Sequence, residues 1–457
     1  MSNNLFDAFN PVSSKLWKQQ IQYELKGADY NETLIWESPE GIKVKPFYHI
    51  DDAKDPLAVT TTVASFKIGQ DIYVQDVAKS AARAQATITR GAEAIRFTIP
   101  NPDTDVNTLL NGLDAAIPAY FYLYFVSIDF VKKIDAIAAH KNATYYVLFD
   151  PVGHLAKDGN WHEGGDNFAL LNTIAQSCKN ISIISINGSL YQNAGANMVQ
   201  QIAYTVGHAI EYFSRIDNIE KPIVIHTAVG SNYFFEIAKL RALRIVFDAV
   251  AKEYNHTQPC HILASPTRRN KTLYDYNVNM LRTTTECMSA VLGGANTVVN
   301  LPYDALYHKG NEFADRIARN QLLILKNESY FDAVNNPADG TYYIEELTEQ
   351  LAEKALVLLK DIESNDGFLK QLTEGSIQRK IAESAAKEQE LFDKGKEVLL
   401  GTNKYPNKND RMSSDLELYP FVKANPRKTL ISPIIEKRLA EKHEQERLES
   451  ENIANVQ

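Results

Sequence analysis

A regular alternation of short apolar segments and longer amphipathic segments constrains this chain more than any other feature. Between about residues 60 and 300, runs rich in β-branched and aromatic residues are each followed by a segment with helical spacing. The expected strands are 64–68, 94–99, 120–126, 145–150, 181–186, 223–228, 261–265 and 297–301. The expected helices between them include 77–89, 128–140, 168–179, 197–214, 234–253 and 277–292. Several strands are apolar almost throughout, which is typical of parallel strands covered on both faces.

Eight strand–helix units of this kind predict an α/β fold of the TIM (β/α)₈ barrel type. A doubly wound open sheet is the structural alternative, but it usually has fewer strands and a glycine-rich first turn. The sequence contains neither GxGxxG nor GxxxxGK[ST], so it gives no support for a phosphate-cradling loop.

The remaining sequence is expected to form additions to the barrel. We predict an N-terminal arm over 1–55, the barrel over 56–305, a helical extension over 306–400, and a connector with a charged C-terminal helix over 401–457. Helices are expected at 311–329, 344–363, 367–374 and 377–398, with a final solvated helix at 434–449. An arm of this size cannot bury its own apolar face, so it should lie on the barrel or on another subunit.

Composition excludes several classes of protein. The chain has 457 residues and a formal net charge of −9, which disfavours binding of nucleic acid through its phosphates. Its start is polar and no run approaches the roughly 18 apolar residues of a membrane span, so we expect neither a signal peptide nor a membrane protein. The three cysteines, Cys178, Cys260 and Cys287, are widely spaced and form no CxxC pair. A reducing cytoplasm is the expected location.

Reactive groups in such barrels lie at the carboxyl ends of the strands. The polar residues expected there are Asp150, Asn187, His226, Ser265 and Asn300. Asp150 and His226 are candidates for an acid/base pair, although mouth-lining polar residues more often only form hydrogen bonds.

Two further groups of residues are candidates for ligand binding. Arg268 and Arg269 follow the seventh strand, where barrels often bind phosphate, and could hold an anion or simply be solvated. His154, His162 and Glu163 lie in the loop after the fourth strand, but their spacing matches no compact metal motif. The other histidine cluster, His256 and His261 around Cys260, lies at the opposite end of the barrel and favours a structural role. We therefore predict no metal site.

Several long segments resemble the methylmalonyl-CoA mutase family. Segments 281–294 (LRTTTECMSAVLGG), 316–325 (RIARNQLLIL), 339–345 (DGTYYIE) and 401–405 (GTNKY) are similar to the family's sequence after the seventh strand. Segment 186–196 (INGSLYQNAGA) resembles its fifth-strand segment, and Leu25, Gly27, Trp36 and 40–48 (EGIKVKPFY) fit its N-terminal arm. The resemblance implies a barrel that carries substrate, an arm that wraps onto another subunit, and adenosylcobalamin held by a second, flavodoxin-like domain.

The chain departs from the family's active pattern at three places. Where active chains read Gly-Tyr-His, this chain reads Gly188-Ser189-Leu190, and a leucine side chain neither donates a hydrogen bond nor transfers a proton. Segment 263–268 (LASPTR) replaces the family's His-Cys-Gln-Thr-Ser-Gly, and 60–71 (TTTVASFKIGQD) replaces the stretch that threads CoA through active barrels. The cobalamin motif DxHxxG is absent from the sequence, and we expect no flavodoxin-like cobalamin domain, which needs about 100 residues or more.

The resemblance thus implies the non-catalytic small subunit of a heterodimeric methylmalonyl-CoA mutase. The large catalytic subunit would be its partner and would hold the adenosylcobalamin, while this chain would bind no cofactor. Its partner-interface candidates are Trp17, Leu25, Trp36 and Tyr48. Asp150, Asn187, His226, Ser265 and Arg268 would then be a vestigial mouth. Two alternatives stay open: an active substrate barrel that uses a separate cobalamin-binding chain, and an unrelated barrel enzyme that uses Asp150, His226 and Arg268.

Overall fold

A computed structural model describes residues 9–59, 61, 63–162, 167–423 and 425–454. Its centre is a closed barrel of eight parallel strands in the order β10-β3-β4-β5-β6-β7-β8-β9. The strands are β3 Lys67–Tyr73, β4 Ala94–Ile99, β5 Ala119–Leu123, β6 Tyr145–Phe149, β7 Ser182–Asn187, β8 Val224–Val229, β9 His261–Pro266 and β10 Thr297–Val299. The predicted TIM barrel is therefore confirmed.

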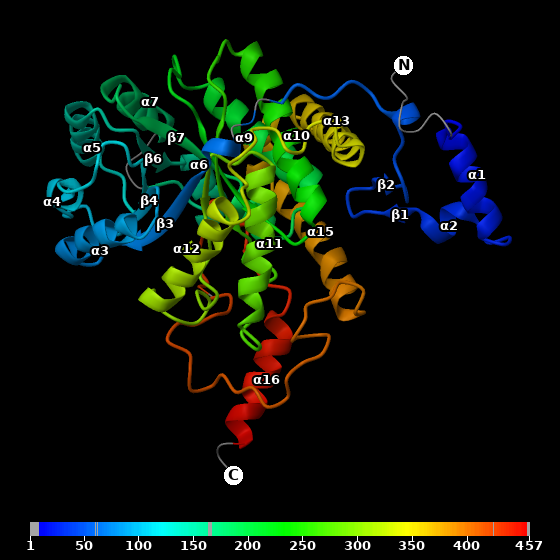
Figure 1. Ribbon diagram of the computed structural model, residues 1–457. Coiled ribbons are helices and arrows are strands. Elements are labelled where there is room, and N and C mark those ends of the chain that lie inside the picture. The colour runs from blue at the N-terminus through cyan, green and yellow to red at the C-terminus, as the bar shows by residue number, and fades with distance from the viewer. Residues whose placement is uncertain (1–8, 60, 62, 163–166, 424, 455–457) are drawn as a thin grey trace.

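Helices surround this barrel, as the alternation in the sequence predicted (Figure 1). They are α3 Val77–Thr89, α4 Val106–Leu110, α5 Ile128–Lys141, α6 Pro151–Asp158, α7 Asn167–Ser177, α8 Ser189–Asn193, α9 Met198–Phe213, α10 Tyr233–Glu253, α11 Val278–Leu292 and α12 Glu312–Asn327. Their apolar faces and the outward side chains of the strands form one large core. A second, smaller cluster fills the barrel itself: Ala94, Tyr120, Tyr146, Leu148, Val224, Leu263 and Val299.

The first barrel strand lies later in the sequence than predicted. Residues Val63–Ser65 form a 3-10 turn, and the strand begins at Lys67 instead of Ala64. Sequence reasoning missed the second half of this strand because Gly69 and Asp71 interrupt its apolar pattern. Gly69 is required there, since a Cβ at this position would lie 2.6 Å from Cγ2 of Val299 on β10.

Three helices extend the barrel on one side: α13 Tyr342–Ser364, α14 Gly367–Thr373 and α15 Ser376–Asp393. Helix α13 packs across α9 and α10, and α14 packs on α9. Helix α15 ends five residues before the predicted end at Val398, where Gly395 adopts a φ of +69°. In the described part of the chain, no helix is long and apolar enough to cross a membrane.

The last helix, α16 Glu441–Ala454, begins seven residues later than predicted and is not simply solvated. Residues 430–440 instead run in extended form along the barrel, where the amides of Ile434 and Leu439 donate to the carbonyls of Ala156 and Arg269. Glu444 on α16 is buried and accepts a hydrogen bond from the amide of Leu273 at 2.8 Å. Burial of one face of this charged helix could not be read from its sequence, because two of its partners, Leu273 and Tyr274, lie 171 and 177 residues before the glutamates that they contact.

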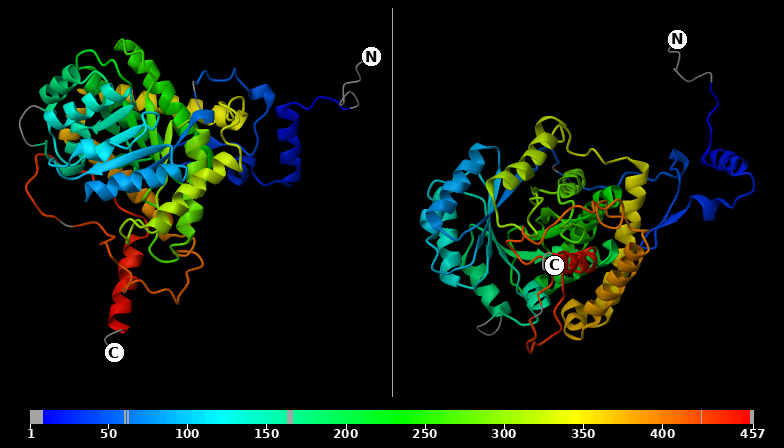
Figure 2. Two further views of the ribbon diagram at one scale, coloured as in Figure 1. Left: turned by 60° about the vertical axis from the view of Figure 1, so that its left-hand side comes forward. Right: turned by 90° about the horizontal axis from the view of Figure 1, so that it is seen from below.

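The N-terminal arm lies beside the barrel and reaches away from it (Figures 1 and 2). It contains α1 Ser14–Glu24, α2 Tyr30–Leu34 and the antiparallel pair β1 Trp36–Glu37 and β2 Lys43–Val44. Helix α1 has no buried residue. Its C-cap is Leu25, and the next two residues, Lys26 and Gly27, are both at positive φ.

Candidate functional site

The barrel mouth contains a chain of polar contacts that begins at Arg96 on β4. The guanidinium of Arg96 binds the carboxylate of Asp71 on β3 in bidentate fashion, at 2.5 and 2.6 Å. Its remaining nitrogen, Nη1, lies 3.2 Å from Nε2 of His226 on β8. Neither Arg96 nor Asp71 was a predicted site residue. The sequence could have indicated them, because an aspartate and an arginine stand on two adjacent strands of an otherwise apolar barrel.

These contacts define the protonation state of His226. Arginine only donates, so Nε2 of His226 accepts from Arg96, and the ring proton lies on Nδ1, which is 3.4 Å from Oγ of Ser189. Burial, together with the charges of Arg96, Lys157 and Arg268, lowers the pKa of His226 well below its usual range. The imidazole is therefore neutral, and Ser189 faces its N–H instead of a lone pair. This arrangement does not activate Ser189 as a nucleophile.

Asp150 and His226 do not form the predicted acid/base pair. Asp150 is the N-cap of α6 and accepts from the amide of Gly153 at 2.8 Å. Its carboxylate contacts His208 at 2.9 Å and Tyr212 at 2.5 Å, both on α9. Burial alone would raise the pKa of Asp150, but the contacts with His208 and Tyr212 outweigh it and lower that pKa. Asp150 thus links α6 to α9.

The other predicted mouth residues take part in local hydrogen bonds. The amide of Asn187 donates to Asp150 at 2.7 Å, and the side chain of Asn187 accepts from Ser189 at 2.5 Å. The hydroxyl of Ser265 lies 3.4 Å from Nε2 of His226. Asn300 donates to a carbonyl and an amide oxygen on α12. The structure thus brings Asn187, His226 and Ser265 to one side of the mouth, where they bind protein groups.

The two arginines after β9 have different surroundings. Arg269 is buried, with its Nε 2.5 Å from the carboxylate of Glu388 and its Nη1 donating to the carbonyl of Lys437 at 2.8 Å. Arg268 is exposed, and within the described residues its side chain forms no ion pair. Arg269 therefore attaches the C-terminal segment, and Arg268 is the one of the two that an external anion can reach.

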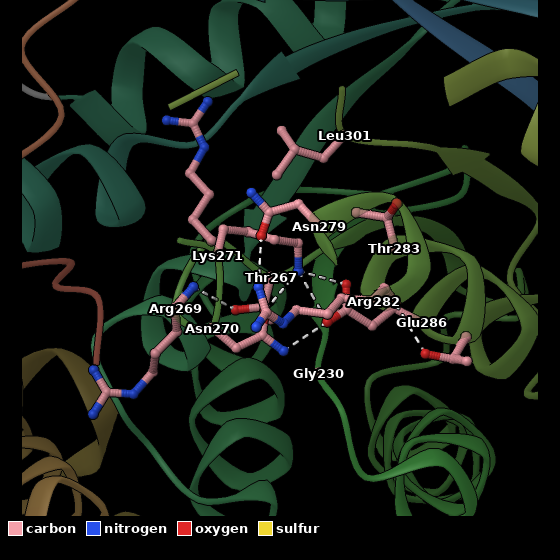
Figure 3. A network of polar contacts seen from close by, with 12 residues as sticks. Gly230, Thr267, Arg269, Asn270, Lys271, Asn279, Arg282, Thr283, Glu286 and Leu301 are labelled. Atoms are coloured by element: carbon pink, nitrogen blue, oxygen red, sulfur yellow. Dashed lines mark hydrogen bonds and ion pairs between the residues drawn. The ribbon is translucent and has the colours of Figure 1, made fainter. Parts of the chain in front are cut away.

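A buried ion pair, which the sequence analysis did not identify, supports this loop. Nζ of Lys271 lies 2.7 and 3.0 Å from the two carboxylate oxygens of Glu286 on α11, and 2.6 Å from Oδ1 of Asn270. Asn270 in turn donates to Glu286 at 2.7 Å, so the three polar groups satisfy one another (Figure 3). Both charged side chains are buried. The network fixes the loop between β9 and α11, which carries Arg268.

Leu190 lies on α8 and is only 1% exposed. It belongs to the large hydrophobic core. Gly188, at the start of α8, is also closely packed, because a Cβ added there would lie 2.7 Å from Oγ1 of Thr205. The side chain of Leu190 is therefore part of the packing between α8 and its neighbours.

Aromatic rings fill the barrel below the mouth. Tyr120 stacks on Tyr146 with ring centroids 4.8 Å apart, and Tyr146 stacks on His261 at 4.6 Å. The hydroxyl of Tyr120 lies 2.7 Å from both Nε2 of His261 and Oγ1 of Thr297. Burial lowers the pKa of His261 to about 3, so this ring is neutral. The stack joins β5, β6, β9 and β10 across the barrel.

The histidine-rich segments show no metal geometry. His154 and His162 stack face to face at 3.6 Å, and Glu163 lies outside the described residues. His256 contacts the carbonyl of Ile219 at 2.9 Å, while His261 faces the barrel interior. Throughout the described ranges, no group of three or more His, Cys, Asp and Glu side chains could hold a metal ion.

The four arm residues differ in their contacts. Trp17 stacks on Phe47 at 4.3 Å and stays 44% exposed. Trp36 meets the edge of a ring on α10 and stays 47% exposed. Leu25 is half-buried, and Tyr48 packs against Tyr343 of the chain's own α13 at 5.1 Å. Tyr48 thus anchors the arm to its own chain, while the two tryptophans keep apolar surface available.

Comparison with known proteins agrees with this architecture. The family model described as methylmalonyl-CoA mutase matches residues 167–451. The methylmalonyl-CoA mutase small subunit of Porphyromonas gingivalis is 31% identical over 449 residues, covering 88% of this chain and 71% of that protein. The small subunit of Streptomyces virginiae is 26% identical, covering 85% and 68%. The methylmalonyl-CoA mutase of Cereibacter sphaeroides is 36% identical, but the match covers 49% of this chain and only 33% of that protein. The chain belongs to the methylmalonyl-CoA mutase family.

Proposed function

We propose that this chain is the non-catalytic small subunit of a heterodimeric, adenosylcobalamin-dependent methylmalonyl-CoA mutase. The large subunit would interconvert methylmalonyl-CoA and succinyl-CoA, and this chain would support it without binding cofactor. A cytoplasmic location is part of the proposal, and the three free, buried cysteines are compatible with a reducing compartment.

The observation that carries the proposal is Leu190. It stands where active members of the family are expected to have a histidine facing the substrate carbonyl. Its side chain is buried in the hydrophobic core and has no group that could donate to or protonate a substrate.

The filled barrel supports the same conclusion. The resemblance implies that active barrels thread CoA through their interior, which requires an open axis. Here the stack of Tyr120, Tyr146 and His261 spans the interior, and Arg96 and Asp71 pair above it. These large side chains pack against one another and occupy the interior of the barrel.

Two histidines near the mouth, His226 and His208, do not fit an axial ligand for cobalt. A ligand histidine must offer a nitrogen lone pair to the metal. Nε2 of His226 faces the donor Arg96, and Nδ1 of His226 carries the ring proton. His208 is fully buried between Asp150 and Tyr191. We therefore assign cobalamin binding to the partner subunit.

The arm supports the proposed heterodimer. Trp17 and Trp36 expose large aromatic surface on a segment that reaches away from the barrel (Figure 2). Exposed tryptophans concentrate binding energy when an interface covers them. With Leu25, they are the proposed contacts with the large subunit, while Tyr48 holds the arm against α13 of its own chain.

Co-expression with a large mutase subunit, followed by size-exclusion chromatography, tests this proposal. We expect a 1:1 complex, and Trp17→Ala should weaken it by tenfold or more, at a cost of about 1.4 kcal/mol or above. Tyr254→Ala, which changes an exposed tyrosine at the end of α10, is the matched control. Failure of the two chains to associate contradicts the heterodimer.

A turnover assay tests the non-catalytic role separately. The purified chain should show no mutase activity with adenosylcobalamin, either alone or with a separate cobalamin-binding protein. Leu190→His should not create activity, because the filled barrel remains. Turnover by the wild-type chain above background would instead favour an active substrate barrel.

A further inference from the structure

The barrel mouth carries a patch of exposed tyrosines that the proposed function does not use. Tyr73 ends β3, Tyr122 lies on β5, and Tyr124 follows β5 and is 58% exposed. The rings of Tyr73 and Tyr122 both meet the ring of Tyr124 in edge contacts, at 6.4 and 5.5 Å between centroids. Active sites of such barrels lie at this end, among the loops that follow the strands.

Two cations lie close to this tyrosine patch. Lys157 lies on α6, which follows β6, the strand beside β5, and its ammonium lies 3.7 Å from one carboxylate oxygen of Glu436. Asn193 donates to the other oxygen of Glu436 at 3.0 Å, and the amide of Arg268 donates to the side chain of Asn193 at 3.0 Å. Lys157 and Arg268 follow different strands, so only the closed barrel brings them together. Figure 3 shows how the buried network around Lys271 holds the loop that carries Arg268.

The charges at the mouth do not balance. Asp71 neutralises Arg96 by bidentate contact, and Glu436 lies 3.7 Å from Lys157. Arg268 is left without a carboxylate partner among the described residues. His226 is neutral and contributes no charge of its own. The mouth therefore presents one uncompensated guanidinium beside three partly exposed phenol rings.

We propose that the barrel mouth binds a small aromatic oxyanion, with Arg268 and Lys157 holding the phosphate or carboxylate group and the tyrosine patch contacting the ring. Guanidinium groups form strong, bidentate hydrogen bonds with such oxyanions. Tyrosine rings contribute offset or edge contacts with an aromatic ligand. This binding site does not depend on the proposed subunit role, because it needs neither the partner nor cobalamin.

Calorimetric titration of the purified full chain with three probes tests the site. The probes are phenyl phosphate, benzoate and inorganic phosphate, which separate the contribution of the ring from that of the charged group. We expect saturable 1:1 binding of phenyl phosphate or benzoate, tighter than that of inorganic phosphate. The stronger of the two aromatic probes identifies the preferred oxyanion.

Three variants locate the binding. Arg268→Ala should weaken binding of the aromatic probe about tenfold, since it removes a charge-assisted hydrogen bond. Tyr124→Leu should weaken the aromatic probe and leave inorganic phosphate unchanged. Arg90→Ala, which removes an exposed arginine at the opposite end of the barrel, should change neither. If Arg268→Ala does not fold, Lys157→Ala serves the same purpose. Absence of saturable binding at millimolar probe, or equal loss in the Arg268 and Arg90 variants, overturns the proposal.

Discussion

Removing one member of the buried Lys271–Glu286 pair should be among the most damaging changes outside the apolar core. Both residues are 1% exposed, and the ammonium lies 2.7 Å from one carboxylate oxygen. In Glu286→Gln, Lys271 would keep its charge with only neutral acceptors around it, including Asn270 at 2.6 Å. Breaking a buried pair in this way costs about 3–5 kcal/mol. The double variant Lys271→Met/Glu286→Leu leaves no charge and should recover most of that loss.

The expected shift in melting temperature is small despite this cost. An unfolding entropy of about 2.1 cal/mol/K per residue gives about 1 kcal/mol/K for a chain of 457 residues. A loss of about 4 kcal/mol therefore lowers the melting temperature by about 4 °C, so urea unfolding followed by circular dichroism is the more sensitive measurement. Lys132→Met, which changes an exposed lysine on α5, is the control. A loss below about 1 kcal/mol in Glu286→Gln, or a double variant as unstable as that single one, would refute the reasoning.

Three further changes test other parts of the structure. Gly159→Ala should destabilise the chain by about 1–2 kcal/mol, because Gly159 has a φ of +88° and its added Cβ would lie 2.8 Å from the carbonyl oxygen of Ile431. The C-terminal segment should then be cleaved faster in limited proteolysis. An unchanged cleavage rate would contradict this prediction. Gly69→Ala should lower the yield of folded protein, since its Cβ would meet Val299 at 2.6 Å inside the barrel, and chromatography of the soluble fraction measures this. Burial and the charge of His154 lower the pKa of His162 to about 4, below the ordinary 6.5. As the pH falls from 6.5 to 4, the unfolded chain is protonated at this histidine while the folded chain is not, so the free energy of unfolding should decrease. His162→Phe should flatten that part of the profile in urea unfolding at successive pH values, and an identical profile would show that other groups control it.

Much of the fold could be predicted because its signal is local. Strands such as 145–149 are apolar throughout, and helix 77–89 has an apolar face and an aspartate cap, so each element is specified within about fifteen residues. The strand Lys67–Tyr73 was misplaced because its inward positions carry Gly69 and Asp71, whose role depends on β10 and β4. The extended segment before α16 was missed for the same reason: its amides donate to carbonyls of Ala156 on α6, Asn193 on α8 and Arg269 after β9.

The candidate site was predictable only in part. Placing Asp150 directly after a strand was correct, because strand ends follow from the pattern, but His226 lies inside β8 and not at its carboxyl end. Their separation was not predictable, since the contacts of Asp150 with α9 depend on how α6 and α9 pack. Arg268 and Arg269 are adjacent in sequence, yet one is exposed and the other is buried against Glu388.

The sequence by itself determined the barrel, its helical additions and the family, because hydrophobic periodicity and long ordered motifs are written along the chain. It also placed Leu190 at the position where a catalytic histidine is expected. Only the tertiary structure decided that aromatic rings fill the barrel, that burial and Arg96 keep His226 neutral, and that Arg268 is the unbalanced charge at the mouth. These properties depend on distances between residues that are far apart in the chain, and closure of the barrel sets those distances.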